Sequence, residues 1–337
     1  MAGLYARWMH AWENGLAERD SSRRVRPFEW GLDWLEPVAA EGDPRERLRA
    51  FVRAALEDSA AFFSYRCPED YRFQQGHLTF TSPLQSPYPE NNLVHAQYFP
   101  ARERRRAVLV LPQWNADAAG HVSLCKLLNR FGLSALRMSL PYHDRRMPPE
   151  LDRADYHLSS NLGRTIQACR QSVIDARACL DWLEMQGYQR LAVLGTSLGS
   201  AMGFIAAAHD PRVGACVFNH ASMYFGDVVW TGLSTRHVRQ GLEGFVTHDE
   251  LREYWRVISP AVYIDRFAGR DVQSLIIWAR HDTTFLPEYS QQMVELFRSR
   301  RLPLKVVVLP CGHYTTGQFP FNWVDGLAMC RFVARHL

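Results

Sequence analysis

The sequence contains no run of 18 apolar residues, and residues 1–19 lack the continuous apolar core of a signal peptide. We therefore expect neither a membrane span nor a secretion signal. The seven cysteines are odd in number, lie scattered along the chain and form no Cys-x-x-Cys pair. Several fall within apolar helix or strand patterns, which is typical of reduced core thiols. These absences favour a cytoplasmic protein.

The excess of positive over negative charge is also small, because the formal net charge is only +4 over 337 residues. Arginines concentrate at 23–26 and 102–106, and neither cluster has an array of flanking aromatic residues or a nucleic-acid motif. We expect both clusters to be exposed and predict no nucleic-acid partner. No internal repeat occurs. With 47% hydrophobic residues, the chain can bury one large core, which predicts one main domain with additions.

The sequence does contain a sharp strand-to-helix turn at Gly195-Thr196-Ser197-Leu198-Gly199. Residues 191–194 are apolar on both faces, as expected for a central strand of a parallel sheet, and 201–208 continue as a helix of small residues. Glycine on either side of the serine permits a strained turn and a close helix. Such a turn exposes the serine hydroxyl, so Ser197 is the candidate nucleophile.

The groups that a serine nucleophile needs follow later in the chain. An imidazole must accept the hydroxyl proton and a carboxylate must orient that imidazole, in the order serine, acid, histidine. The apolar strand 274–279 leads to Asp282, and the next strand, 304–309, leads to His313. Three loops of one sheet would therefore supply all three residues.

Two other acids compete with Asp282. Asp265 and Asp271 lie nearby, and some sites of this design take the acid from the strand that follows the nucleophile. That strand, 215–218, ends in Asn219-His220-Ala221-Ser222, which contains no carboxylate. Asp282 is therefore the predicted acid.

Two adjacent pairs, His281 with Asp282 and His143 with Asp144, resemble metal or catalytic pairs. Adjacent side chains generally point apart, so we predict no chemical role for either pair. We expect no metal and no organic cofactor.

The strand-to-helix turn at Ser197, called a nucleophile elbow, is followed by the loops of the acid and the base. These features and their order resemble the α/β-hydrolase superfamily over residues 75–337. The resemblance implies a mostly parallel, doubly wound α/β sheet with helices on both faces. A narrower resemblance is to the branch around α/β-hydrolase domain-containing protein 18, which implies no well-defined substrate. It rests on Leu140-Pro141-Tyr142, on the helix end 181–188 and on Thr231-Gly232-Leu233-Ser234.

An oxyanion hole of two backbone N–H groups would contribute a few kcal/mol of transition-state stabilisation. The N–H of Leu198, directly after the nucleophile, is the first predicted donor. The second is expected in the loop after strand 107–111, where relatives commonly carry His-Gly and this chain has Pro112-Gln113-Trp114-Asn115. By register Trp114 supplies that N–H. Because Gln113 replaces the glycine that permits the usual turn, the side-chain amide of Asn115 is the alternative.

The chain divides into a helical extension, 1–74, and a catalytic domain, 75–337. Asp43-Pro44-Arg45-Glu46 predicts a helix start in the extension, with a cap, proline at N1 and glutamate at N3. Strand patterns begin at about residue 75. They are expected at 77–86, 94–101, 107–111 and 133–140, before a helix at about 162–187.

An aromatic-rich insertion at about 222–259 interrupts the strand-helix alternation. Ligands of doubly wound sheets bind beyond the carboxyl ends of the strands, so this insertion is predicted to be a lid over Ser197. Tyr224, Phe225 and Trp230 are its predicted substrate-binding residues.

These observations predict a serine hydrolase that cleaves a carboxylic ester or related acyl bond of a small molecule through an acyl-enzyme. The same residues would serve an acyltransferase, an amidase or a thioesterase. A protein of another class, a non-catalytic scaffold or ligand-binding protein on this fold, is the alternative that the irregular Gln113 favours. The substrate and the oligomeric state are left open.

Overall fold

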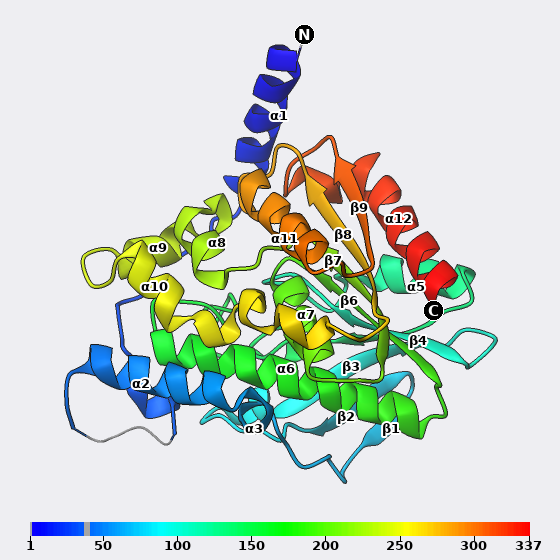
Figure 1. The fold of residues 1–337 in the computed structure, drawn as a ribbon, viewed down its shortest axis with the longest axis horizontal. Helices are drawn as coiled ribbons and strands as arrows, with labels where there is room; N and C mark the ends of the chain where they lie inside the picture. The colour runs from blue at the N-terminus through cyan, green and yellow to red at the C-terminus, as the bar shows by residue number, and fades with distance from the viewer. Residues whose placement is uncertain (1, 37–40) are drawn as a thin grey trace.

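A computed structural model describes residues 2–36 and 41–337 of the chain, and its centre is a mixed β-sheet (Figure 1). Over the described residues the sheet has nine strands in the order β1-β2-β3-β5-β4-β6-β7-β8-β9. The six strands from β5 to β9 in this order are parallel, and β1, β2 and β3 pair antiparallel at one edge. The strands are β1 (Arg72–Gln74), β2 (His77–Thr81), β3 (Leu93–Phe99), β4 (Arg106–Leu111), β5 (Ser134–Met138), β6 (Arg190–Thr196), β7 (Val213–Asn219), β8 (Gln273–Ala279) and β9 (Leu304–Leu309).

Alternate residues of the central strands enter two separate cores. In β4, Leu109 and Leu111 belong to one hydrophobic cluster, whereas Val108 and Val110 belong to the other. Successive side chains of a strand point to opposite faces, which gives this period of two. Because helices cover both faces of the sheet, both sets of side chains are apolar. The sequence therefore predicted the fold class correctly.

Helices cover both faces of the sheet, and α1 projects from the body (Figure 1). Residues of α6, α7 and α11 fill the first core, and residues of α5 and α12 fill the second. The helices are α1 (Ala2–Ala17), α2 (Pro44–Glu57), α3 (Ser59–Phe62), α4 (Pro89–Asn92), α5 (Val122–Arg130), α6 (Leu162–Met185), α7 (Leu198–Ala208), α8 (Phe225–Thr231), α9 (Arg236–Leu242), α10 (His248–Tyr254), α11 (Pro287–Ser299) and α12 (Phe321–His336).

The helix predicted at Asp43 is confirmed as α2. The Asp43 side chain accepts a hydrogen bond from the Arg45 N–H, Pro44 is the first helical residue, and one face of the helix is buried. The strand predicted at 77–86 is shorter than expected, because β2 ends at Thr81 just before Pro83. A proline has no N–H for the next rung of the ladder.

The segment between β7 and β8, in which the insertion is predicted, contains α8, α9 and α10. A capping box between Thr247 and Glu250 begins α10. This helix contacts α2 of the N-terminal segment through the Arg45–Glu250 and Arg49–Glu253 ion pairs. The insertion is therefore anchored from outside the sheet. None of the described helices combines the length and the apolar character that crossing a membrane requires.

Candidate active site

Ser197 lies at the turn between β6 and α7, in a backbone conformation that non-glycine residues rarely adopt. Its φ is 55° and its ψ is −118°. The two flanking glycines are required by space. A Cβ on Gly195 would lie 2.1 Å from the carbonyl oxygen of Gly199, and a Cβ on Gly199 would lie 2.1 Å from that of Leu111. The close packing of α7 on the sheet therefore fixes the strained turn.

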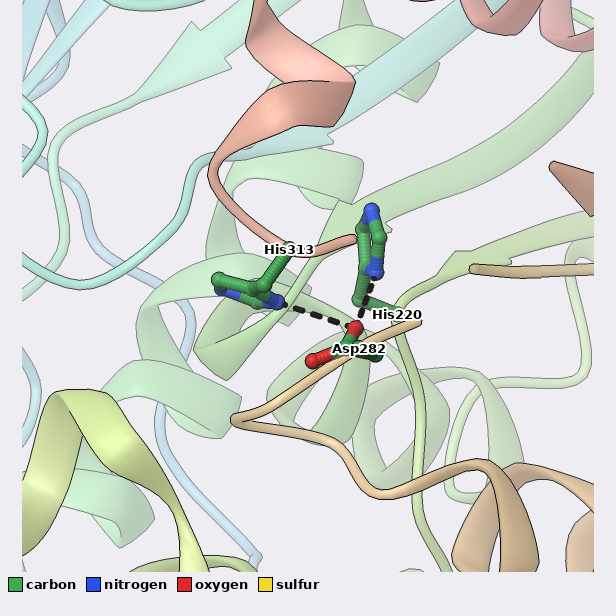
Figure 2. Close-up of side chains that lie close together, drawn as sticks. All are labelled: His220, Asp282 and His313. Atoms are coloured by element: carbon green, nitrogen blue, oxygen red, sulfur yellow. Dashed lines mark hydrogen bonds and ion pairs between the residues drawn. The ribbon is translucent and has the colours of Figure 1, made fainter. Parts of the chain in front are cut away.

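Asp282 follows β8 and accepts hydrogen bonds on both carboxylate oxygens. Its Oδ1 accepts from the N–H groups of Thr284 and Phe285, at 2.8 and 2.7 Å. Its Oδ2 lies 3.2 Å from Nδ1 of His313, the residue beyond β9 that was predicted as the base (Figure 2). A carboxylate can only accept, so His313 carries its proton on Nδ1 and has Nε2 as its acceptor nitrogen.

His220 is the member of this cluster that sequence reasoning missed. It follows β7 and places its Nδ1 2.7 Å from the same Oδ2 of Asp282 (Figure 2). Its ring is buried, and Nε2 has no hydrogen-bond partner among the described residues. The available signal was its place at the end of the strand between the Ser197 strand and the Asp282 strand. Because that loop contains no carboxylate, none of its residues is among the predicted site residues.

Burial and the two imidazoles act in opposite directions on Asp282. Burial alone would raise the pKa of its carboxyl, but His313 and His220 beside it lower that pKa well below its usual range. Burial would lower the pKa of His220, and the hydrogen bond to Asp282 reverses this, so the pKa of His220 is raised. Asp282 is therefore ionised at neutral pH, as the orienting acid must be.

The two predicted oxyanion donors lie beside the same cavity as Ser197. Leu198 is the first residue of α7, where a backbone N–H has no acceptor within the helix. The side chain of Trp114 is fixed by its own contacts, since its Nε1 donates to the carbonyl oxygen of Ala154 at 3.0 Å. The turn takes its positive φ, 61°, at Asn115, and Gln113 has none. Glycine is therefore not required at Gln113.

The alternative donor, the side chain of Asn115, is already engaged on its oxygen side. Its Oδ1 accepts a hydrogen bond of 2.8 Å from the N–H of Ala154. This contact ties the loop after β4 to residue 154 and restricts the rotation that the amide would need to turn toward Ser197. The backbone N–H of Trp114 stays the predicted second donor.

A cavity of about 910 Å³ joins the candidate catalytic residues. Ser197, His220 and His313 lie along it, and it continues between α5 and α12, where Leu127 and Met329 line it. Phe225 is the one of the three predicted lid residues that lines this cavity. The guanidinium carbon of Arg252 lies 3.6 Å from the ring centroid of Tyr224. Trp230 stacks on His248, with 5.6 Å between the ring centroids.

Asp325 of α12 is a buried acid in the same cavity that the sequence did not reveal. Its Oδ2 accepts a hydrogen bond of 2.8 Å from Asn219, and burial raises its pKa to about 6. Among the described residues, a metal-sized cluster of His, Cys, Asp or Glu occurs once, as His220, Asp282 and His313. Because both imidazoles point Nδ1 at one oxygen, hydrogen bonding to a shared carboxylate accounts for this cluster.

Comparisons with known proteins identify the fold. No family model and no curated protein matches the chain. Among solved structures, acetyl xylan esterase 1 from Thermoanaerobacterium sp. is 15% identical with a TM-score of 0.60, covering 96% of this chain and 98% of the esterase. The acetyl xylan esterase from Paenibacillus sp. R4 is 16% identical with a TM-score of 0.59, covering 93% and 100%.

The Pyrococcus horikoshii acylaminoacyl peptidase is 13% identical with a TM-score of 0.57. The match covers 83% of this chain but only 43% of the peptidase, so the chain corresponds to less than half of that protein. At such identities the similarity concerns the fold alone. Together with the mostly parallel sheet and the helices around it, these matches show that the chain has the α/β-hydrolase fold.

Proposed function

We propose that this protein is a serine hydrolase that cleaves a carboxylic ester or related acyl bond. One observation carries the proposal. Ser197, at its strained turn, and His313 line the same cavity, and Nδ1 of His313 is hydrogen-bonded to Asp282. A carboxylate, an imidazole and a hydroxyl that lines the cavity, all at the ends of strands of one sheet, form the machinery of acyl transfer. The structural neighbours are esterases and a peptidase, which agrees with this chemistry.

In the proposed reaction, Ser197 Oγ attacks the substrate carbonyl while Nε2 of His313 accepts the hydroxyl proton. The N–H groups of Leu198 and Trp114 stabilise the oxyanion, and His313 then donates the proton to the departing alcohol. Water, deprotonated by His313, hydrolyses the acyl-enzyme and restores Ser197. No hydrogen bond joins Ser197 Oγ to His313 within the described structure. In free enzymes such contacts often tighten only when substrate binds.

The cavity favours a small-molecule substrate with an apolar group. Phe225, Leu127 and Met329 present apolar side chains along it, and each methylene buried there would contribute about 0.8 kcal/mol. The seven cysteines form no disulfide, and six of them are buried. This supports the proposal of a reducing, cytoplasmic location. Kinship with the α/β-hydrolase domain-containing protein 18 branch is part of the proposal and rests on the sequence motifs alone.

A fluorophosphonate probe tests the proposal directly. It should form a covalent adduct on Ser197 of the wild type and none on Ser197→Ala, and mass spectrometry of the labelled peptide identifies the residue. Hydrolysis of p-nitrophenyl esters from acetate to octanoate then measures turnover and chain-length preference. A folded wild type that neither reacts with the probe nor cleaves any of these esters would favour the scaffold alternative.

A further inference from the structure

The projecting helix α1 carries one completely buried acid, Glu13. Its carboxylate lies against the loop that contains His313. Oε2 accepts a hydrogen bond of 3.1 Å from the N–H of Tyr314, and Oε1 accepts two of 2.7 Å from the N–H and the hydroxyl of Thr315. All three hydrogen bonds therefore come from the two residues that follow the candidate base.

The residue before His313 is tied to the same carboxylate. The N–H of Gly312 donates to the hydroxyl oxygen of Thr315 at 2.8 Å, and that hydroxyl donates to Glu13. A Cβ on Gly312 would lie 2.3 Å from the carboxyl carbon of Glu13, so the approach depends on glycine. Residues 312, 314 and 315 thus contact the carboxylate directly or through the Thr315 hydroxyl. His313, which lies between them in the chain, points to Asp282.

A buried carboxyl group is a costly way to attach a helix, because burial removes its hydrogen bonds to water. The partners that replace water at Glu13 are two backbone N–H groups and one hydroxyl. Apolar packing would serve attachment alone, and Met9, fully buried on the same helix, already supplies it. Hydrogen bonds differ from apolar contacts in being directional. Glu13 therefore fixes the position and orientation of the loop backbone.

The chain beyond α1 reinforces this arrangement. Arg23 donates a hydrogen bond of 2.7 Å to the hydroxyl of Tyr314. The ring of Phe285, in the Asp282 loop, stacks on the imidazole of His313, with 5.5 Å between centroids and 12° between planes. The His313 loop thus contacts both the N-terminal segment and the Asp282 loop.

We infer that Glu13 is a positioning residue for His313, through which the N-terminal helix becomes part of the active site. This inference rests on the proposed function, since it assigns His313 the role of base. A displacement of a catalytic group by 1 Å can lower turnover by about 100-fold. Loss of Glu13 should therefore reduce kcat at nearly constant KM, because the cavity that binds substrate does not include Glu13.

The test uses the full chain with Glu13→Ala and Glu13→Gln, and with Glu18→Ala, at an exposed position directly after the same helix, as the matched control. The rate of fluorophosphonate labelling and kcat for p-nitrophenyl butyrate, both normalised to folded protein, should fall about 30-fold or more in Glu13→Ala. Glu13→Gln should lose less, because its amide oxygen can still accept from Thr315. Glu18→Ala should match the wild type. Equal rates for the wild type and Glu13→Ala, with only a lower Tm, would overturn the inference.

Two further measurements separate this inference from the proposed function. Thr315→Val removes the hydroxyl that links Glu13 to Gly312 while preserving side-chain shape. It should also lower kcat, and it serves as the test if Glu13→Ala does not fold. Hydrogen–deuterium exchange of the peptide spanning 310–318 should be faster in Glu13→Gln than in Glu18→Ala. Unchanged exchange overturns the inference. If the exchange result holds but the wild type neither reacts with the probe nor cleaves esters, the proposed function fails and the loop contact stands.

Discussion

His220 makes a shorter hydrogen bond to Asp282 than His313 does. The Nδ1–Oδ2 distance is 2.7 Å for His220 and 3.2 Å for His313. One carboxylate oxygen thus serves two imidazoles, and only the second belongs to the predicted triad. In the proposed triad, His220 would therefore hold the carboxylate of Asp282 in the orientation that it needs to orient His313.

We expect His220→Ala to lower kcat about tenfold or more, because Asp282 loses the shorter of its two hydrogen bonds to imidazole and gains freedom to turn. His220→Asn, whose amide can donate near the position of Nδ1, should recover part of the rate. The free energy of unfolding should also fall by about 1–3 kcal/mol in His220→Ala, since a buried acceptor loses a donor. Steady-state kinetics and chemical denaturation measure both effects. Full activity in His220→Ala would show that His313 and the loop amides suffice to orient Asp282.

Ser197→Ala should lose at least about a thousandfold in kcat on any ester that the wild type cleaves, while its circular dichroism spectrum is unchanged. No neighbouring group replaces the hydroxyl as nucleophile. Alanine also removes no hydrogen bond of the Ser197 side chain that the structure records. Comparable turnover in the variant would place the chemistry elsewhere.

The three candidate acids differ sharply in their surroundings. Asp282 is buried and forms hydrogen bonds with two imidazoles. Asp265 pairs with Arg300 at an exposed site, and Asp271 contacts Gln273. Asp282→Asn should therefore reduce kcat by at least about a thousandfold. Asp265→Asn and Asp271→Asn should change it less than about twofold, as surface substitutions commonly do. A larger loss in either of these folded variants would reassign the acid.

Phe225 and Trp230 offer a matched pair for the apolar part of the cavity, because only Phe225 lines it. Wild-type activity should rise from acetate to medium-chain esters, by up to about 0.8 kcal/mol of transition-state stabilisation for each buried methylene. Phe225→Ala should flatten this rise. Trp230→Ala should lower Tm and leave the chain-length profile unchanged. A flattened profile in Trp230→Ala alone would restore the substrate role first expected of that residue.

Asp325 predicts a pH-dependent stability. Its folded-state pKa of about 6 exceeds the usual value of 3.8, so the folded protein binds this proton more tightly than the unfolded chain. The resulting stabilisation is complete below about pH 4 and is lost as the pH rises through 6. Asp325→Asn, neutral at every pH, should therefore raise Tm over the wild type by about 3 °C or more at pH 8. The gain should shrink toward pH 4.

The control for this prediction is Asp271→Asn, since Asp271 is an exposed acid. Its melting curves should follow those of the wild type across the same pH range. Parallel profiles for Asp325→Asn and the wild type would mean that the Asp325 carboxyl does not titrate between pH 4 and 8.

The sequence by itself determined the parallel sheet, the turn at Ser197 and the strand ends that carry Asp282 and His313. These features depend on local patterns: apolar runs set the strands, and glycines beside Ser197 permit a turn that few other residues allow. Parallel topology then brings the carboxyl ends of the strands to one edge, so the order of motifs along the chain already predicted that Asp282 and His313 would meet.

Only the tertiary structure decided which residues support that site. Glu13 contacts Thr315 from 302 positions away along the chain, and His220 reaches Asp282 over 62. Composition did not single out Phe225 from Tyr224 and Trp230, because all three are aromatic residues at the start of the insertion. Such choices depend on where a projecting helix and an insertion pack against the sheet. Long-range packing leaves no periodic trace in the sequence, and it determines which buried polar groups find partners.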